Sequence, residues 1–432
     1  MSARLIAAAI RAGQRRAVDV VDDALDRAQD DPFGCFWSLD AERARTDAAA
    51  VDRAVAAGRD PGLLAGVPVA VKDCFDVSGL PTSAGVCWSR PPRIPWADAQ
   101  AVANLRRAGA IVIGKTAMHQ LGWGMSGQAP GFEACRNPSD PTLMPGGSSS
   151  GSAAAVGAGI VPIALGTDAG GSVRQPAAWC GTVGFKPTLG SVSTARCAPM
   201  APSLDTVGFL ATSVVDCDLA LAAATGAPGP GAALPTRPPR VGVMESALLA
   251  ADLEVAGACR DALSRWESSG AELSVIAIPW ERRALGALYA YELADCWADR
   301  LAGESEVLSD EVIAGIGVGQ TVPAEDHDRV LSLIAELRLR ATGAVEGLDV
   351  VAGPTAPILP LPLGEPDPTL VAGRYTRVFN GLAWPAASIP CGVEEPGRVG
   401  LQLASPAGHD SELLGWAAQL ETILSDEAHA PA

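Results

Sequence analysis

Apolar residues recur at two spacings along this chain, and these spacings predict its secondary structure. Over 18–28 they stand three or four positions apart, which is typical of the buried face of an amphipathic helix. The segments 67–71 and 110–113 are short apolar runs of the kind that form buried strands, and 98–108 between them predicts a helix. Because strands and helices alternate, the pattern favours an α/β sheet.

The same alternation continues beyond this region. A run of small residues over 152–159 predicts a short helix packed closely on a sheet, 160–165 predicts the next strand, and a glycine-rich turn at 168–172 follows it. Further along, we expect three helices and two strands, in the ranges 252–269, 281–302 and 326–345 for the helices and 272–278 and 348–352 for the strands.

Two segments rich in proline and glycine interrupt this pattern. Residues 225–240 separate a first half rich in motifs from a plainer second half. They predict either a domain boundary or a long surface loop. A second such segment, 354–368, leads into 375–386, and we find no internal repeat.

Charge and composition exclude several classes of protein. The formal net charge of −17 repels phosphate backbones and anionic lipid, so we expect neither a nucleic-acid partner nor a membrane partner. Ten cysteines without a CxxC pair are typical of reduced thiols in a cytosol. We find no export signal and no apolar run of about 18 residues, and therefore expect a cytoplasmic protein.

Serine and lysine carry the candidate chemistry. Two glycine-flanked serine clusters lie 24 residues apart, in a chain with only four histidines to activate them. Only three of the 32 basic residues are lysine, namely Lys72, Lys115 and Lys186. A buried lysine can lose its proton and act as a base, whereas arginine stays protonated. Lys72 ends the apolar run 67–71, which makes it the candidate base.

Three patterns match well-known binding or catalytic loops, but their context argues against each. Residues 109–116, GAIVIGKT, match a phosphate-binding loop, yet the middle four residues form an apolar run whose amides belong in a sheet. Residues 122–127, GWGMSG, match a dinucleotide-binding pattern without the strand that must precede it. Residues 147–151, GSSSG, put Ser149 at a nucleophile elbow, but a proline-rich loop precedes them instead of a strand.

The candidate residues lie within five longer motifs, which read LLAGVPVAVKDCFDVSGLPTSAG, LRRAGAIVIGKT, CRNPSDPTLMPGGSSSGSAAAVGAG, GTDAGGSVRQPAAWCGTVGFKPTLG and SLDTVGFL. Together they resemble the amidase signature family, densely over 62–218 and more thinly over 350–403. The resemblance implies a single α/β/α domain over 1–432 around a large mixed sheet. Within it, 62–218 is the catalytic core and 240–346 is a helical insertion that shapes the substrate pocket.

By this resemblance, Ser172 is the nucleophile, Ser148 is a bridging serine on a cis peptide bond, and Lys72 is the base. The implied reaction is cleavage of an amide C–N bond in a small molecule through an acyl-enzyme, with no metal and no cofactor. A proton relay from Ser172 through Ser148 works only if Lys72 is neutral. Burial at the end of a strand shifts a lysine pKa in that direction.

The glycine-rich turn supplies the second part of the predicted site. We expect the backbone N–H groups of Ala169, Gly170, Gly171 and Ser172 to converge on the developing oxyanion, because glycines permit the concave turn that such a nest needs. We interpret Arg174 as a buried hydrogen-bonding residue rather than as a clamp for the substrate.

The substrate pocket is the least determined part of the site. Members of the family build their acyl pocket where this chain has MHQLGW, which puts Met118, Gly122 and Trp123 there, and we expect Trp384 from the C-terminal side. These residues predict an apolar pocket for an aromatic or compact hydrophobic group. The alternative is that the tryptophans belong to the core.

Other functions remain open. The resemblance includes the glutamine-hydrolysing A-type subunit of a tRNA amidotransferase complex, which needs partner chains. A catalytically silent scaffold is the weakest alternative, because all three catalytic positions are filled. A general esterase would use Ser149 instead of Ser172. We favour an independent amidohydrolase whose partner is a small-molecule amide, and we leave a homodimer open.

Overall fold

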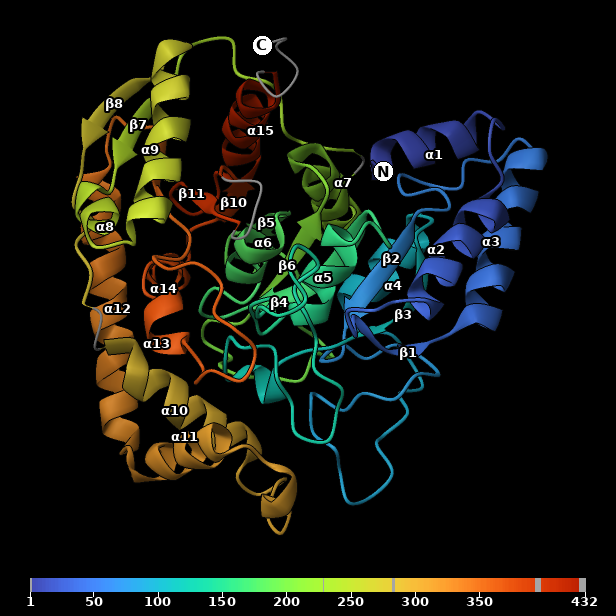
Figure 1. Cartoon of the computed structure of the whole chain (residues 1–432), viewed down its shortest axis with the longest axis horizontal. Helices are drawn as coiled ribbons and strands as arrows, with labels where there is room; N and C mark the ends of the chain where they lie inside the picture. Colours follow the sequence, from blue (N-terminus) through green and yellow to red (C-terminus); the bar gives the residue numbers. More distant parts are fainter. Residues whose placement is uncertain (1, 228, 282–283, 393–397, 427–432) are drawn as a thin grey trace.

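A single mixed sheet forms the centre of the molecule. The computed structural model describes residues 2–227, 229–281, 284–392 and 398–426. In these ranges eleven strands pair in the order β1-β3-β2-β4-β6-β5-β10-β11-β9-β7-β8 (Figure 1). Their bounds are β1 Phe36–Leu39, β2 Pro68–Lys72, β3 Ile111–Thr116, β4 Ile163–Asp168, β5 Val183–Lys186, β6 Thr206–Ala211, β7 Arg240–Val243, β8 Glu272–Val275, β9 Val350–Pro354, β10 Ala386–Pro390 and β11 Gly400–Ala404.

Strand direction changes across the sheet, which confirms the expected mixed α/β architecture. β2 runs parallel to both of its neighbours, β3 and β4, and β7 runs parallel to β8 and β9. The other pairs are antiparallel, including β4 with β6 and β10 with β11. Strands from both halves of the chain therefore build one sheet, and the proline-rich segment 225–240 connects them rather than separating two sheets.

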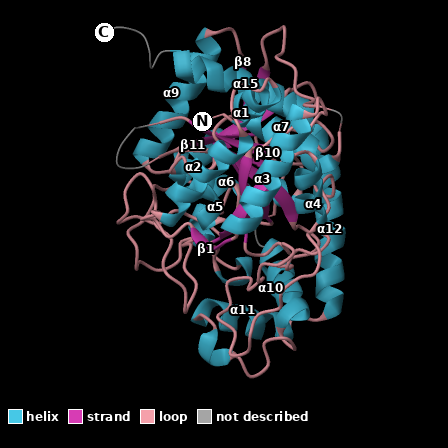
Figure 2. Cartoon of the chain, turned by 90° about the vertical axis from the view of Figure 1, so that its right-hand side faces the viewer, coloured by secondary structure: helices cyan, strands magenta, loops and turns pink. Residues whose placement is uncertain are grey.

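Helices cover both faces of this sheet, and Figure 2 shows the strands running through the middle of the molecule between them. The helices in the described ranges are α1 Ala3–Arg11, α2 Ala17–Gln29, α3 Ala41–Ala56, α4 Gln100–Arg107, α5 Ser150–Gly157, α6 Arg174–Cys180, α7 Val214–Thr225, α8 Glu245–Leu249, α9 Leu253–Ser268, α10 Ala284–Trp297, α11 Asp310–Thr321, α12 Ala324–Ala344, α13 Thr369–Ala372, α14 Thr376–Gly381 and α15 Asp410–Asp426. None of them is long and apolar enough to span a bilayer.

Helices α10 and α11 lie together at one end of the molecule, beyond the sheet (Figures 1 and 2). They fall within the helical insertion predicted over 240–346. Strands β7 and β8 also fall in this range, and they join the sheet through backbone pairing.

The apolar pattern identified the longer elements and missed the shorter ones. Helices were expected and found at 98–108, 252–269 and 326–345, with ends that differ by a few residues. The strand predicted over 160–165 is β4, displaced toward the C-terminus. Strands such as β5, VGFK, and β11, GLQLA, were not predicted, because four or five residues with glycine or polar members show no clear period.

Helix α5 packs directly on the sheet because its small residues allow it. A Cβ on Gly151 would overlap the carbonyl oxygen of Cys35 and lie 2.5 Å from the amide nitrogen of Ala117. The hydroxyl of the next residue, Ser152, donates to the carbonyl oxygen of Leu165 in β4 at 2.8 Å. This close approach brings the serine-rich start of α5 to the ends of β2 and β4.

The start of α1 depends on a carboxylate that lies more than 200 positions away in the sequence. Asp216, buried in α7, accepts hydrogen bonds from the backbone N–H groups of Ala3 and Arg4 and from the Ser2 hydroxyl, at 3.0 to 3.1 Å. The first N–H groups of a helix have no partner within the helix, so a carboxylate stabilises them.

We expect Asp216→Ala to lower the free energy of unfolding by about 2 kcal/mol, because it leaves the buried N–H of Ala3 and two partly buried donors without this acceptor. Urea denaturation measures the loss, and hydrogen exchange should show it first in the amides of α1. The control is Asp23→Ala, which removes an exposed pairing with Arg15 and should change stability by less than about 0.5 kcal/mol. Equal stability of the two variants would contradict this role of Asp216.

Candidate active site

The side chain of Lys72 ends β2 inside the protein, next to two hydroxyl groups. It has no exposed surface. Its Nζ lies 2.8 Å from the Oγ of Ser148 and 2.9 Å from the Oγ1 of Thr167. Burial lowers the pKa of Lys72, because removing an ammonium group from water penalises its charged form. The structure therefore joins two of the three predicted catalytic residues through a direct hydrogen bond.

Ser148 lies in the loop before α5, and the peptide bond between Gly147 and Ser148 is cis, as the resemblance implied. The side chain is buried. Two backbone hydrogen bonds hold the residue in place, since the N–H of Gly147 donates to Oε1 of Gln175 at 2.9 Å and the N–H of His119 donates to the Ser148 carbonyl oxygen at 3.1 Å. Ser148 is thus fixed on both sides while its hydroxyl faces Lys72.

Ser172, the third predicted catalytic residue, follows the glycine-rich turn after β4 and lines a cavity. Only 5% of its surface is exposed. The backbone N–H of Ser149 donates to the Ser172 carbonyl oxygen at 3.1 Å, which ties the two serine segments together across 23 positions of sequence. The serine clusters that were separate in the sequence are therefore neighbours in the fold.

Ser149 itself does not occupy a nucleophile elbow. It is the residue before α5, and its hydroxyl donates to the carbonyl oxygen of Thr167 at 3.2 Å. The rejected phosphate-loop motif is also explained by the fold, because Ile111–Thr116 is the fully buried strand β3 and its amides belong to the sheet. Lys115 pairs there with Asp73 at 2.8 Å.

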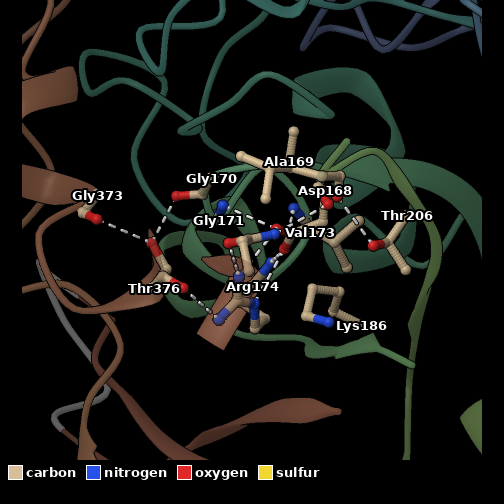
Figure 3. Close-up of polar contacts among 12 residues, drawn as sticks. Asp168, Ala169, Gly170, Gly171, Val173, Arg174, Lys186, Thr206, Gly373 and Thr376 are labelled. Carbon is tan, nitrogen blue, oxygen red and sulfur yellow. Dashed lines mark hydrogen bonds and ion pairs between the residues drawn. The ribbon is translucent and has the colours of Figure 1, made fainter. Parts of the chain in front are cut away.

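The turn between β4 and α6 is built on a buried ion pair (Figure 3). Arg174 donates to the two carboxylate oxygens of Asp168 at 2.8 and 2.9 Å, and neither residue has exposed surface. Burial alone would raise the pKa of Asp168, but the Arg174 charge and hydrogen bonds hold that pKa well below its usual range. This confirms Arg174 as a buried hydrogen-bonding residue.

One of the predicted oxyanion donors is engaged elsewhere. The N–H of Gly171 donates to Oδ1 of Asp168 at 2.8 Å, so the prediction that it points at the oxyanion is corrected. A carboxylate is a strong acceptor for a buried amide, and residue spacing alone does not reveal this local bond. Within the described residues, the N–H groups of Ala169, Gly170 and Ser172 have no acceptor.

Residues from the second half of the chain hold the carbonyl groups of this turn. The Tyr289 hydroxyl, from α10, donates to the carbonyl oxygen of Ala169 at 2.7 Å. The Thr376 hydroxyl, from the start of α14, donates to the carbonyl oxygen of Gly170 at 2.7 Å (Figure 3). Neither residue was predicted, because no local motif marks them and each acts across more than 100 positions of sequence.

Asp205 was also missed, although it belongs to the quoted motif SLDTVGFL. It accepts hydrogen bonds from the backbone N–H groups of Met200 at 2.9 Å and Ala201 at 3.2 Å. Burial raises the pKa of Asp205 to about 6. Its charge acts on Lys72 in the opposite sense to burial, raising the lysine pKa. An acidic residue inside a motif shared with the candidate base is the signal that could have drawn attention to it.

A cavity of about 450 Å³ opens beside Ser172. Its lining is mostly apolar or small, with three charged side chains, and comprises Gly122, Trp123, Gly124, Met125, Gly170, Ser172, Met200, Gly286, Tyr289, Ala290, Glu311, Ala314, Gly315, Val318, Asp367, Thr369, Leu370 and Arg377. Helices α10 and α11 and the segment around α13 thus form walls opposite the glycine-rich turn.

Two of the four predicted pocket residues lie elsewhere. Gly122 and Trp123 line the cavity, but Met118 and Trp384 do not. Met118 is buried in the main hydrophobic core, and Trp384 is buried against Phe379 in a separate cluster. The prediction is corrected for both residues: Trp384 belongs to the core, as the alternative had it, and Met118 is a core residue as well.

Comparison with known proteins identifies the family of this chain. The Amidase family matches residues 19–414. The chain belongs to the amidase family. Among curated relatives, a glutamyl-tRNA(Gln) amidotransferase subunit of the A type, from Thermus thermophilus, is 36% identical to this amidase, covering 100% of the chain and 99% of the relative. The corresponding subunit from Chromohalobacter salexigens is 34% identical, with 99% and 97% covered.

Solved structures extend the comparison to the fold. A crystal structure of an amidase matches with a TM-score of 0.92 and 32% identity, covering 98% of this chain and 100% of the other. A peptide amidase in complex with the inhibitor chymostatin matches with a TM-score of 0.86 and 25% identity, covering 98% and 97%. The family and its α/β fold are therefore established for this chain.

We expect Gly171→Ala to disrupt the turn that carries Ser172. Gly171 has φ +122°, and a Cβ there would overlap the Thr376 hydroxyl oxygen. Strain and overlap together should cost roughly 3 kcal/mol or more. The matched control is Gly190→Ala, which also has positive φ, +81°, but open space around the new atom. Thermal unfolding of both variants measures the difference, and a Gly171→Ala protein as stable as the control would refute the overlap.

Proposed function

We propose that this amidase hydrolyses small-molecule amides, with Ser172 as nucleophile and Lys72 as base through Ser148. The observation that carries the proposal is the 2.8 Å contact between the buried Nζ of Lys72 and the Oγ of Ser148. A hydroxyl is a weak nucleophile until a base removes its proton, and a desolvated lysine is one of the few side chains that can do so without histidine.

The reaction runs in two halves. In the first, Ser172 attacks the amide carbonyl while its proton passes to Ser148 and the Ser148 proton passes to neutral Lys72. Ser148 then delivers a proton to the departing amine, and the acyl group stays on Ser172. In the second half, water takes the place of Ser172 as nucleophile and releases the acid. Lys72 returns to its neutral form in each half.

The developing negative charge needs donors that are already in place. The N–H groups of Ala169, Gly170 and Ser172 support this role, because no protein acceptor in the described residues occupies them. Gly171 contributes differently, by holding the turn to Asp168. The hydrogen bonds from Tyr289 and Thr376 to the turn keep its carbonyl groups directed away from the oxyanion.

The relatives support a second candidate, the glutamine-hydrolysing subunit of an amidotransferase complex. Both relatives named above are amidotransferase subunits and cover nearly the whole chain. The mostly apolar cavity lining supports instead a free-standing amidase for a less polar amide. Ten free thiols support a cytoplasmic location for either candidate.

We expect Ser172→Ala to abolish amide hydrolysis, by at least about 10⁴-fold in kcat, because no other nucleophile forms the acyl-enzyme. Ser149→Ala should keep most activity, because Ser149 only bonds the carbonyl of Thr167. Release of ammonia or amine from a panel of primary amides, anilides, ureas and glutamine measures both. Retained activity in Ser172→Ala would refute the proposal, and ammonia from glutamine alone would favour the amidotransferase subunit.

The pH dependence should report on Lys72. Its neutral form is required, so kcat/KM should rise with pH through the lysine pKa, which burial lowers. The Asp205 carboxylate, whose own pKa is about 6, raises the pKa of Lys72. Asp205→Asn removes that charge and keeps an acceptor for Met200 and Ala201, so the acid limb should move to lower pH.

Glu292→Gln is the control for this shift. Glu292 holds the same segment, accepting from the Ser203 N–H at 2.9 Å, and its charge raises the pKa of Asp205 without being one of the leading influences on the Lys72 pKa. The acid limb of this variant should stay where the unmodified amidase has it. If the acid limb of the Asp205→Asn profile of kcat/KM against pH stays in place or moves to higher pH, the base that controls the rate is a group other than Lys72.

A further inference from the structure

Arg377 places a positive charge inside the cavity, beside the turn that carries Ser172. The residue belongs to α14 and lines the cavity. Its Nε lies 3.6 Å from the position that a Cβ on Gly170 would occupy. Its guanidinium carbon lies 5.8 Å from the centre of the Tyr289 ring, which faces the same space. The cation therefore stands next to two of the residues that shape the oxyanion turn.

Only one N–H of this guanidinium forms a hydrogen bond within the described structure. Its Nη2 donates to the carbonyl oxygen of Thr369 at 2.9 Å. Among the residues that the structure describes, no carboxylate oxygen lies within the 4.0 Å of an ion pair, and Nε and Nη1 have no acceptor. Arg377 is partly exposed, and a guanidinium without a counter-ion in a mostly apolar cavity is available to pair with an anionic group of a ligand.

The other two charged residues of the cavity do not supply that counter-ion. The Asp367 carboxylate accepts from the N–H groups of Met125, Ser126 and Thr369 at 2.7 to 2.9 Å. It also lies 3.6 Å from Nδ1 of His119. Its bonding capacity is thus used within the cavity wall.

Glu311 lies in the first turn of α11 and is exposed to solvent. Neither acid forms an ion pair with Arg377 in the described structure, so the guanidinium faces the substrate space with four of its five N–H groups not bonded to the described protein.

We propose that Arg377 binds a carboxylate on the amide substrate, so that this amidase acts on small amides that also carry an acid group. The planar guanidinium fork matches a carboxylate through two parallel N–H···O bonds, which Nε or Nη1 can form together with the second N–H of Nη2. This inference rests on the proposed function and specifies its substrate class. The apolar walls, including Trp123, Met125 and Met200, cover the carbon chain between the two polar ends.

The position of Arg377 also limits the length of the substrate's carbon chain. Gly170 is two residues before Ser172, and Arg377 is in contact range of Gly170. The carboxylate of a bound substrate therefore lies only a few bonds from the carbonyl that Ser172 attacks. Monoamides of short dicarboxylic acids fit this arrangement, and longer chains place the acid beyond Arg377.

The experiment compares matched substrates. Monoamides of the dicarboxylic acids with three to six carbons are assayed beside neutral fatty amides of equal chain length. We expect the unmodified amidase to prefer the acid at one or two of the short lengths by about tenfold or more in kcat/KM. Arg377→Gln should lose about 100-fold on those acids, mainly through KM, and less than about threefold on the neutral amides. Arg377→Lys should recover part of the preference.

Arg374→Gln is the charge-matched control. Arg374 precedes the same helix by two residues and lines a different cavity, next to Tyr375 and Trp280. Its substitution removes the same unit of charge from the protein, so any effect of net charge appears in both variants. Arg374→Gln should leave the preference for acids unchanged.

The outcomes separate this inference from the proposed function. Neutral amides hydrolysed in a Ser172-dependent way, with no preference for acids at any length, would overturn the inference and leave the function standing. Equal losses on acids and neutral amides in a folded Arg377→Gln protein would also overturn it, since that result indicates a structural role through Thr369. Hydrolysis of neither series would overturn both.

If Arg377→Gln does not fold, competitive inhibition by short dicarboxylates tests the inference instead. Short dicarboxylates such as succinate and glutarate should inhibit the unmodified amidase competitively and Arg377→Lys more weakly. An absence of inhibition by every dicarboxylate in the unmodified amidase would overturn the inference.

Discussion

A primary amine kept away from water is the constraint on which the site depends. Lys72 ends the central strand β2, which has parallel neighbours on both sides, so the side chain emerges into the interior rather than at an edge. Desolvation favours the neutral amine, and the hydroxyls of Ser148 and Thr167 give it polar partners that carry no charge. A carboxylate in direct contact would instead have favoured the ammonium form.

The other two lysines show how strongly surroundings decide the role of a residue. Both are also without exposed surface. Lys115 forms an ion pair with Asp73, which stabilises its charge. Lys186 donates to the carbonyl oxygen of Pro187, and burial lowers its pKa to about 7. Neither of them has a serine hydroxyl among its hydrogen-bond partners in the described structure. Burial alone does not make a lysine a base for serine chemistry.

The ion pair between Asp168 and Arg174 connects the turn that carries Ser172 to distant parts of the fold. Arg174 also donates to Asn380 and Gln402, at 2.6 Å each, and these come from α14 and β11. The turn is therefore held through its ion pair by the C-terminal half of the sheet and through its carbonyl groups by Tyr289 and Thr376. The N-terminal half supplies the proposed catalytic residues, while the second half holds the turn that carries Ser172 and forms most of the opposite wall of the cavity.

The sequence by itself determined the class of fold and pointed to the proposed chemistry. Apolar runs and helical spacing revealed the alternating elements, and Lys72, Ser148 and Ser172 stood out because they lie in short motifs whose residues act close to one another. Only the tertiary structure decided which N–H groups of the turn are free, that Met118 and Trp384 are core residues, and that Tyr289, Thr376 and Arg377 reach the site. Those facts depend on contacts between segments far apart in the chain, and local spacing carries no information about which distant side chains will share one cavity.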